Sequence, residues 1–406
     1  MDALGITTSD NRIHFAKMDT PLLVGSFLHT VSNLVEKKGY EDIVIDCHDV
    51  GRAFPNILVP IAGIVDYYNQ KGIDFQFENL SSFLERSHFS APLVVSKNQD
   101  LLQGNVLNLV WRYETDSDTF ALSTEMLRSI SQEVVCEEGV IDAMLWCMNE
   151  IMDNVIVHSE SQSGFVMGQI HKQTKHIAFC VYDHGQGIFN SLKDSPHAPK
   201  TPLEAIQLAI QESVTRDKKV GQGNGMWGLS EIVKNNSGRI TIISGSGLYM
   251  RSNGDVTVNN KLTSLSPSHG ACLVDFQLNY SKEISLAEAL KGHKPVNYRT
   301  ESFEDDNGAV TFRLADAKTG TGTRESGKRI RTDLINMFND TKKGIVIDFD
   351  GLSVVSSSFA DELVGKMLVH FGFFGFNQIV RLKNMNQTIQ AIVERSVAQR
   401  MAEAFT

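Results

Sequence analysis

A strand followed by a helix and a second strand is the feature that most constrains how this chain folds. Residues 43–47 form a β-branched run that predicts a strand, and residues 73–77 alternate in polarity as a second strand does. Between them, residues 56–69 carry apolar side chains at helical spacing, and Gly72 is placed to end that helix. So short a strand–helix–strand sequence predicts a parallel βαβ unit.

The same order of elements returns near the C-terminus. The pattern predicts a strand at residues 345–349, a helix at 359–371, a strand at 378–382 and a further helix at 387–402. Aligned without a gap, the run Ile43–Asp46 is identical to Ile345–Asp348, at an offset of 345 minus 43, or 302 residues. Four identical residues are weak evidence alone, but the shared order of elements favours a duplicated fold.

The length of 406 residues favours two or three domains. Residues 96–104 are polar, and residues 286–308 contain a glycine, a proline and a run of acids, so both segments are predicted to be linkers. The predicted domains are therefore residues 1–95, 105–283 and 300–406. The Thr-Gly run at 318–323 indicates a surface loop, with contact to an anion as the alternative.

Composition excludes several classes of protein. An apolar fraction of 42% and a charged fraction of 21% are typical of globular proteins. A net charge of −10 disfavours nucleic acids and anionic membranes as partners, because binding to phosphate needs clustered Lys and Arg. The five scattered cysteines form no CxxC pair, which argues against a cysteine zinc site or a disulfide framework. With no signal peptide at residues 1–15 and no long apolar run, we expect a cytoplasmic protein.

The first of three chemically suggestive motifs lies on one predicted helix. Its apolar positions, at helical spacing, are Ile141, Met144, Leu145 and Met148. Glu150, Asn154 and His158 follow at i, i+4 and i+8, so they share a face. The amide oxygen of Asn154 is a suitable ligand for Mg²⁺, and Glu150 could polarise a nucleophile that faces a γ-phosphate. The alternative, when this motif is considered alone, is that these residues form an ordinary polar stripe on the helix.

The second motif follows an apolar strand at residues 177–182. This strand ends in Asp183, and Gly185 and Gly187 come directly after. An acid at a strand end can accept a hydrogen bond from the amino group of adenine, and glycines let the backbone pass close to a base. Because Asp-x-Gly-x-Gly is also common in turns, the motif alone decides little.

The third motif is a glycine-rich run before an apolar helix. It consists of Gly221, Gly223, Gly225 and Gly228. Glycines at a helix start expose backbone N–H groups to phosphate oxygens, and the helix dipole adds to the attraction. No Gly-Lys-Ser/Thr follows, so this is not a Walker A loop, and no GxGxxG follows a strand as a Rossmann site requires.

Together, in this order and spacing, the three motifs resemble the N, G1 and G2 boxes of the GHKL superfamily (gyrase, heat-shock chaperone, histidine kinase, MutL). The resemblance covers residues 145–276 and closes with a strand led by Gly270. It implies a pocket for ATP with Mg²⁺, in which Glu150 is the general base, Asn154 the Mg²⁺ ligand and Asp183 the reader of adenine.

The resemblance also assigns the glycines. It implies that Gly185 and Gly187 line the base pocket, and that the four glycines of the third motif hold the phosphates. Residues 190–220 would form a mobile lid over the nucleotide. Lys219, with Lys218 before it, would reach the γ-phosphate, although a solvated pair of lid charges explains these two lysines equally well.

The C-terminal block resembles STAS-like domains and, more distantly, anti-anti-sigma proteins, in which a GHKL kinase phosphorylates a serine at a helix start. Ser357 falls at the acceptor position, but Ser356 stands where that pattern has Asp and Phe359 where it has Gly. The alternative is plain helix capping, for which Ser358 and Asp361 have the right spacing. The first block looks like a degenerate copy, since Pro55 takes the place of Ser357, and is expected to be a docking or dimer surface.

The resulting expectation is an α/β (α+β) protein, with a central Bergerat-type α/β sandwich flanked by N- and C-terminal STAS-like βα modules. We expect a signalling switch that binds ATP and Mg²⁺, with ATPase or protein-serine kinase activity, protein partners at the STAS-like modules and a homodimer as one option. A non-catalytic module that sequesters a partner is the alternative. A histidine kinase is disfavoured because no two-helix dimerisation segment precedes the motifs, and the net charge disfavours a MutL-like DNA clamp.

Overall fold

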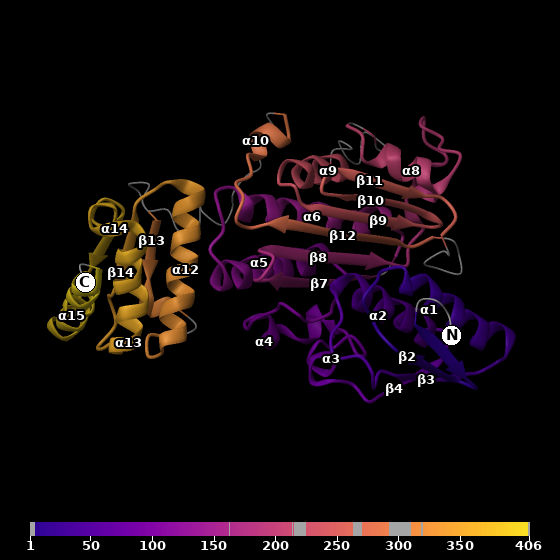
Figure 1. The fold of residues 1–406 in the computed structure, drawn as a ribbon, viewed down its shortest axis with the longest axis horizontal. Helices are drawn as coiled ribbons and strands as arrows, with labels where there is room; N and C mark the ends of the chain where they lie inside the picture. The colour runs from indigo at the N-terminus through magenta and orange to yellow at the C-terminus, as the bar shows by residue number, and fades with distance from the viewer. Residues whose placement is uncertain are drawn as a thin grey trace. The chain divides into compact units, whose positions relative to one another are not determined.

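The computed structural model describes residues 5–161, 163–212, 214, 225–262, 270–291, 310–317 and 320–404. The fold is mixed α/β, as predicted, and the chain divides into two compact units (Figure 1). The first unit is Met1–Met126, Ala143–Asn279 and Ala287–Gly292, and the second is Leu127–Asp142, Tyr280–Leu286 and His293–Thr406. None of the helices in the described part of the chain has both the length and the apolarity to cross a membrane.

The N-terminal sheet contains the predicted βαβ unit. Its strands, in spatial order, are β1 (Ile6–Ser9), β2 (Arg12–Phe15), β3 (Asp42–Asp46) and β4 (Asp74–Glu78). β1 and β2 form an antiparallel hairpin, whereas β2, β3 and β4 are parallel. The crossovers are α1 (Leu23–Ser32) with the π-helical turn η1 (Asn33–Lys37), and α2 (Pro55–Asn69). The predicted parallel βαβ unit is therefore confirmed.

A sheet of eight strands forms the centre of the first unit. Its spatial order is β11-β10-β9-β12-β8-β7-β6-β5. The strands are β5 (Leu93–Val94), β6 (Trp111–Tyr113), β7 (Gly164–His171), β8 (His176–Asp183), β9 (Arg239–Ser244), β10 (Gly247–Ser252), β11 (Asp255–Asn259) and β12 (Cys272–Asn279). Its pairs are antiparallel except β5 and β6. Residues 93–94, which the predicted boundary at residue 95 places in the first module, form the edge strand β5 of this larger sheet.

Helices connect these strands. They are α3 (Ser82–Arg86), the 3-10 turn η2 (Val95–Lys97), α4 (Gln99–Leu102), α5 (Asp116–Glu133), α6 (Val140–His158), α7 (Gly187–Leu192), α8 (Pro202–Ala209), α9 (Gly225–Asn235) and α10 (Leu286–Ala289). The helix predicted for the first motif and the helix predicted after the third are confirmed as α6 and α9. The polar segment at 96–104 is not an irregular linker, because most of it lies in η2 and α4.

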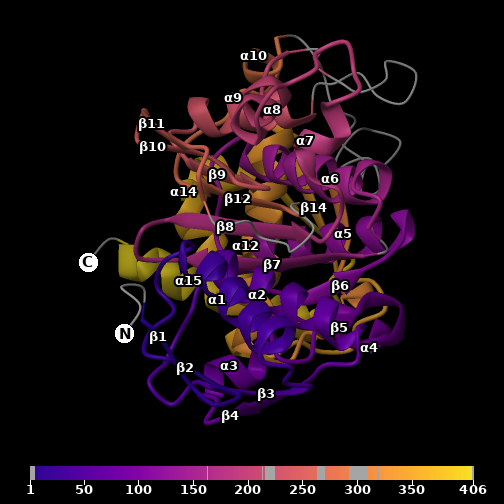
Figure 2. The same ribbon diagram turned by 90° about the vertical axis from the view of Figure 1, so that its right-hand side faces the viewer.

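The helix α2 lies between the two sheets of the first unit (Figures 1 and 2). Its apolar residues share one hydrophobic core with alternate residues of the large sheet: Phe165, Met167, Cys180, Tyr182, Ile243 and Leu273. Gly63 makes this close approach possible, because a Cβ atom there would lie 2.5 Å from the Tyr182 ring. The N-terminal sheet and the large sheet are thus joined through a common core.

The second unit has its own parallel sheet. Its strands are β13 (Val310–Arg313), β14 (Ile345–Asp348) and β15 (Val380–Lys383), in that order. Its helices are η3 (Leu314–Asp316), α12 (Arg324–Thr341), α13 (Ser357–Ala360), the π-helical η4 (Asp361–Gly365), α14 (Lys366–Ile379) and α15 (Gln387–Ala404). The helical run begins two residues before the predicted position and continues past Gly372, where positive φ produces a kink. The following strand therefore starts at Val380 rather than at residue 378.

The parallel strands of the N-terminal sheet and of the sheet in the second unit form the same corner. Asp46 ends β3 and Asp348 ends β14, and each carboxylate accepts a hydrogen bond from the backbone N–H two residues later, at 3.2 and 2.9 Å. Each also accepts from an asparagine after the next strand, Asn79 at 2.9 Å and Asn384 at 2.8 Å. Both asparagines have positive φ, 57° and 59°. This shared geometry supports the duplicated fold predicted from the sequence.

The predicted offset of 302 residues also holds at the helices. Pro55 is the first residue of α2 and Ser357 is the first residue of α13. The structure therefore places at equivalent positions the two residues that the alignment paired.

Candidate functional site

A row of four residues crosses the large sheet at one end. The strand register pairs Asp183 with Gly164 on one side and with Cys272 on the other, and pairs Cys272 with Ser244. Side chains alternate between the faces of a sheet, and Tyr182 faces α2. Asp183 therefore points to the face opposite α2.

Asp183 is a buried carboxylate with capacity for a further hydrogen bond. Its side chain is 4% exposed, and its Oδ1 accepts a hydrogen bond of 2.8 Å from the Gly185 N–H. Burial raises the pKa of Asp183 to about 7, although the Gly185 N–H favours the charged form. Within the described ranges no cationic side chain lies at ion-pair distance, so the carboxylate has the chemistry to accept from a polar ligand.

The loop from Asp183 to Gly187 is fixed by backbone contacts on both sides. The Gln186 N–H donates to Ser159 O, at the end of α6, over 2.7 Å. The Ala271 N–H, just before β12, donates to Gly185 O over 2.8 Å. A Cβ atom at position 185 would lie 2.0 Å from Ser159 O, so only glycine fits. Gly187 has φ of +71°, which is also a conformation that favours glycine.

The helix α6 brings Glu150 to the start of α9. A Cβ atom on Gly225 would lie 2.3 Å from Glu150 Oε2, so the first residue of α9 passes directly over this carboxylate. Burial raises the pKa of Glu150, and the nearby Asp153 raises it further. Glu150 and Asn154 are both half-buried on α6. The first and third motifs are thus adjacent in space.

The remaining predicted glycines fall into two groups. Gly228 is buried in α9, where a Cβ atom would lie 2.2 Å from Trp146 Cη2, so it lets α9 pack closely against α6. Its predicted contact with phosphate stays a prediction. Gly221, Gly223 and Lys219 lie outside the described residues, as does the neighbouring Lys218.

Part of the segment predicted as a lid packs on the sheet. The helix α8 contacts β10 and β9, and the Leu203 N–H at its start donates to Asn260 Oδ1 over 3.1 Å. Within the predicted lid, residues 190–212 and 214 are described.

His184 joins the helix α2 to the loop of Asp183, and no sequence motif indicated this role. Its Nε2–H donates to Gly63 O in α2, and its Nδ1 lies 3.0 Å from the Tyr182 hydroxyl. Burial lowers the pKa of His184 to about 4, so the imidazole is neutral. The bond spans 121 residues, which is why no local pattern indicated it.

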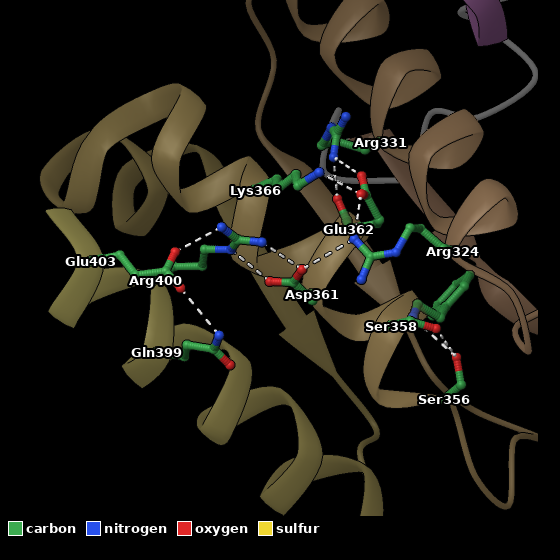
Figure 3. A network of polar contacts seen from close by, with 11 residues as sticks. Arg324, Arg331, Ser356, Ser358, Asp361, Glu362, Lys366, Gln399, Arg400 and Glu403 are labelled. Carbon is green, nitrogen blue, oxygen red and sulfur yellow. Dashed lines mark hydrogen bonds and ion pairs between the residues drawn. The ribbon is translucent and has the colours of Figure 1, made fainter.

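In the second unit, Ser357 is exposed at the first position of α13. The residue that caps this helix is Ser356, whose Oγ accepts from the Phe359 N–H over 3.1 Å. The predicted capping pair of Ser358 and Asp361 is therefore wrong. Asp361 instead binds Arg400 through two hydrogen bonds of 2.7 Å (Figure 3).

A network of charges surrounds the residue after Asp361 (Figure 3). Glu362 is 3% exposed, and its carboxylate contacts Arg331 at 2.7 Å, Arg324 at 3.0 Å and Lys366. Burial raises the pKa of Glu362, but hydrogen bonds from Lys366 and Arg331 outweigh it and lower the value to about 2. These contacts fix the helical run that begins at Ser357.

Comparison with known families identifies one part of the chain. Residues 326–390 match the family model of the STAS-like domain of unknown function (DUF4325). The second unit contains a STAS-like domain. The match runs from the first turn of α12 into α15, so it includes Ser357 and, of the charge network, Glu362, Arg331 and Lys366. No curated protein and no solved structure matches the chain.

Proposed function

We propose that the first unit binds ATP with Mg²⁺ in a GHKL-type pocket, and that the chain is a signalling switch with ATPase or protein-serine kinase activity. The observation that carries this proposal is Asp183. It is a buried carboxylate at a strand end, without a cationic partner among the described residues, in a loop that Gly185 and Gly187 let pack closely against Ser159 and Ala271.

The roles of the other residues follow from their chemistry. Asp183 accepts a hydrogen bond from the amino group of adenine. Asn154 supplies a neutral oxygen ligand for Mg²⁺, which prefers a few protein oxygens together with phosphates and water. Glu150, half-buried with a raised pKa, has the properties of a general base for an attacking hydroxyl or water. The start of α9 presents N–H groups to phosphate.

The fold offers a matched control for this assignment. Asp275 on β12 is also buried, and burial also raises its pKa to about 7. It lies on the opposite face of the same sheet, where Asn56 of α2 donates to it over 3.2 Å. Replacement of Asp275 therefore changes a similar group outside the proposed pocket.

Calorimetric titration with ATP and MgCl₂ tests the pocket. We expect Asp183→Asn and Asn154→Ala each to weaken binding by about tenfold or more, equal to the loss of one charge-assisted hydrogen bond or metal ligand. Asp275→Asn should bind ATP as the unaltered protein does. No affinity for ATP in the unaltered protein, or equal losses in Asp183→Asn and Asp275→Asn, would show that the pocket is wrongly placed.

Incubation with γ-labelled ATP separates the activities. Label on the protein indicates a kinase, free phosphate an ATPase, and neither indicates a module that only binds. Ser357 is our proposed acceptor, because it is exposed at a helix start, where the helix dipole favours a phosphate. Ser357→Ala should lose the label. Ser353 is an exposed serine of the same loop, and the control variant Ser353→Ala should keep the label. Retention of all label in Ser357→Ala would exclude this acceptor.

A further inference from the structure

A second cluster of polar side chains lies at the N-terminal sheet, away from the residues of the proposed pocket. His14 is in β2, and His48 and Asp49 follow the end of β3. These side chains meet at the carboxyl ends of the parallel strands β2 and β3, next to Asp46. The carboxyl edge is where open parallel sheets most often bind their ligands.

The two imidazoles lie between two carboxylates. Their rings stack with centroids 4.4 Å apart and planes inclined by 23°. On one side, both Nε2 atoms lie 3.2 Å from Asp49 Oδ2. On the other side, Asp46 Oδ2 lies 3.1 Å from Nδ1 of His48 and 3.5 Å from Nδ1 of His14.

This geometry orients the lone pairs of the rings. When the Nδ1 atoms carry hydrogen and face Asp46, both Nε2 atoms direct lone pairs towards Asp49. A carboxylate behind a metal-binding histidine commonly fixes the ring in this way. The three ligand atoms lie within 4.8 Å of one another. Their N···O separations of 3.2 Å also match the edge of a zinc tetrahedron, about 3.3 Å for bonds of about 2.0–2.1 Å.

His14 is not explained by folding alone. Its Nδ1 is buried and makes no hydrogen bond within the described part of the chain, because 3.5 Å from Asp46 is longer than such a bond. A buried polar atom without a full hydrogen bond costs free energy. The buried Nδ1 atom of His14 therefore adds no stability to this corner.

The repeated corner in the second unit supplies the comparison. There Asp348 and Asn384 keep the same hydrogen bonds, but Arg313 is the register partner of Asp348, as His14 is of Asp46. Asp350 and Gly351 stand at the positions equivalent to His48 and Asp49, and Arg313 pairs with Asp350 at 3.5 Å. The corner thus forms without imidazoles, and the two histidines are an addition specific to the N-terminal sheet.

We propose that His14, His48 and Asp49 bind one Zn²⁺ ion, that Asp46 orients His48 through its Nδ1 atom, and that the fourth position is open to water or a ligand. Two imidazoles and one carboxylate suit Zn²⁺ and related transition metals, and three protein ligands with an open position are typical of zinc sites that act on or exchange a ligand. This site uses none of the residues assigned to ATP and Mg²⁺.

The test is titration of the full, metal-stripped chain with ZnCl₂ in the absence of nucleotide. We expect one equivalent of Zn²⁺ to bind at a site that His48→Ala and Asp49→Asn each weaken by at least tenfold. Because both side chains are about half exposed, neither substitution should alter folding, which circular dichroism checks. His29→Ala, an exposed histidine on α1, is the matched control and should bind Zn²⁺ normally.

A second variant tests the role of Asp46. Asp46→Asn removes the charge behind the histidines and should weaken Zn²⁺ binding by about 10- to 100-fold, as losses of such supporting groups do. Absence of bound Zn²⁺, or unchanged affinity in both His48→Ala and Asp49→Asn, would overturn the proposal. The second result would place the metal elsewhere, for example at a cysteine.

Discussion

At the scale of single residues, two buried aspartates define the two faces of the large sheet. Asp183 and Asp275 both lie in its interior strands, and burial raises the pKa of each to about 7. Asp275 has a partner in Asn56 on the face covered by α2, whereas Asp183 faces the proposed pocket. On one face the carboxylate of Asp275 is bonded within the protein, and on the other the carboxylate of Asp183 is our proposed ligand-binding group.

Asp275 should make the stability of the protein depend on pH. Its folded pKa of about 7 lies above the ordinary value of 3.8, so the folded state binds the proton more tightly than the unfolded state. Its contribution to stability is therefore complete below about pH 4 and is lost as the pH rises through 7. We expect Asp275→Asn to gain stability relative to the unaltered protein between pH 5 and pH 8, by on the order of 2 kcal/mol. Urea unfolding measures this, and an equal difference at both pH values would contradict it.

Asp183 should make nucleotide binding depend on pH in the opposite sense. The ionised carboxylate accepts from adenine more strongly than the protonated acid does, and a pKa of about 7 leaves Asp183 mostly protonated at pH 6. We therefore expect ATP to bind more weakly at pH 6 than at pH 8, by up to about tenfold, because the ionised fraction falls about tenfold. The phosphates of ATP also titrate in this range, but their contribution to the pH dependence of binding is the same in every variant. The excess dependence should vanish in Asp183→Asn and persist in Asp275→Asn, and its survival in Asp183→Asn would refute this role.

At the scale of elements, the approach of α2 to β8 depends on one glycine. A Cβ atom on Gly63 would lie 2.5 Å from the Tyr182 ring, and Gly63 O accepts the hydrogen bond from His184. We expect Gly63→Ala to lower the free energy of unfolding by about 1–3 kcal/mol through overpacking. Gly51→Ala, where no atom lies within 4 Å of the added Cβ, should be close to neutral. Denaturant unfolding compares the two, and equal effects would show that α2 can shift freely.

In the second unit, several side chains of the helix α12 bond to residues 131–136, and Asn336 makes three of these hydrogen bonds. Asn336 is fully buried, donates to Ser131 O and Val134 O over 2.9 Å, and accepts from the Cys136 N–H over 2.7 Å. Asn336→Ala removes these three buried hydrogen bonds, which we expect to cost about 3 kcal/mol. Asn339→Ala, which removes a single bond to Cys136 O, should cost about 1 kcal/mol. Chemical unfolding measures the loss in the free energy of unfolding for each variant, and equal losses would contradict this prediction.

At the scale of the whole molecule, the two units do not follow the order of the chain. Leu127–Asp142, from the ends of α5 and α6, belongs to the second unit together with residues 293–406. The predicted third domain begins at residue 300, and that boundary stays a prediction. A domain that begins at residue 300 would omit the backbone groups at 131–136 to which Asn336 bonds.

A fragment of residues 300–406 should therefore be less stable than the second unit in the full chain. It lacks the backbone groups at 131–136 that Asn336 binds, and so exposes part of α12. We expect faster amide hydrogen exchange in α12 of the fragment than in the full chain, whereas β14 at the centre of its sheet should remain protected. Equal exchange in α12 would show that the fragment is complete as a folding unit.

Local periodicity was sufficient to predict several helices and strands. Apolar spacing located α2, α6, β8 and β14 to within a residue or two, and it placed Asp183 at a strand end and Glu150 and Asn154 on one helix face. The repeat of Ile43–Asp46 indicated the second parallel sheet. These features were predictable because each depends on residues close together in the chain.

The tertiary structure alone decided which distant residues meet. The bond between His184 and Gly63 spans 121 residues, and the bonds of Asn336 span about 200, so neither produces a local pattern. His14 and His48 also come together only because β2 and β3 are neighbours in a sheet. Such contacts arise from packing between elements. Packing depends on shape and burial, which short-range sequence patterns do not specify.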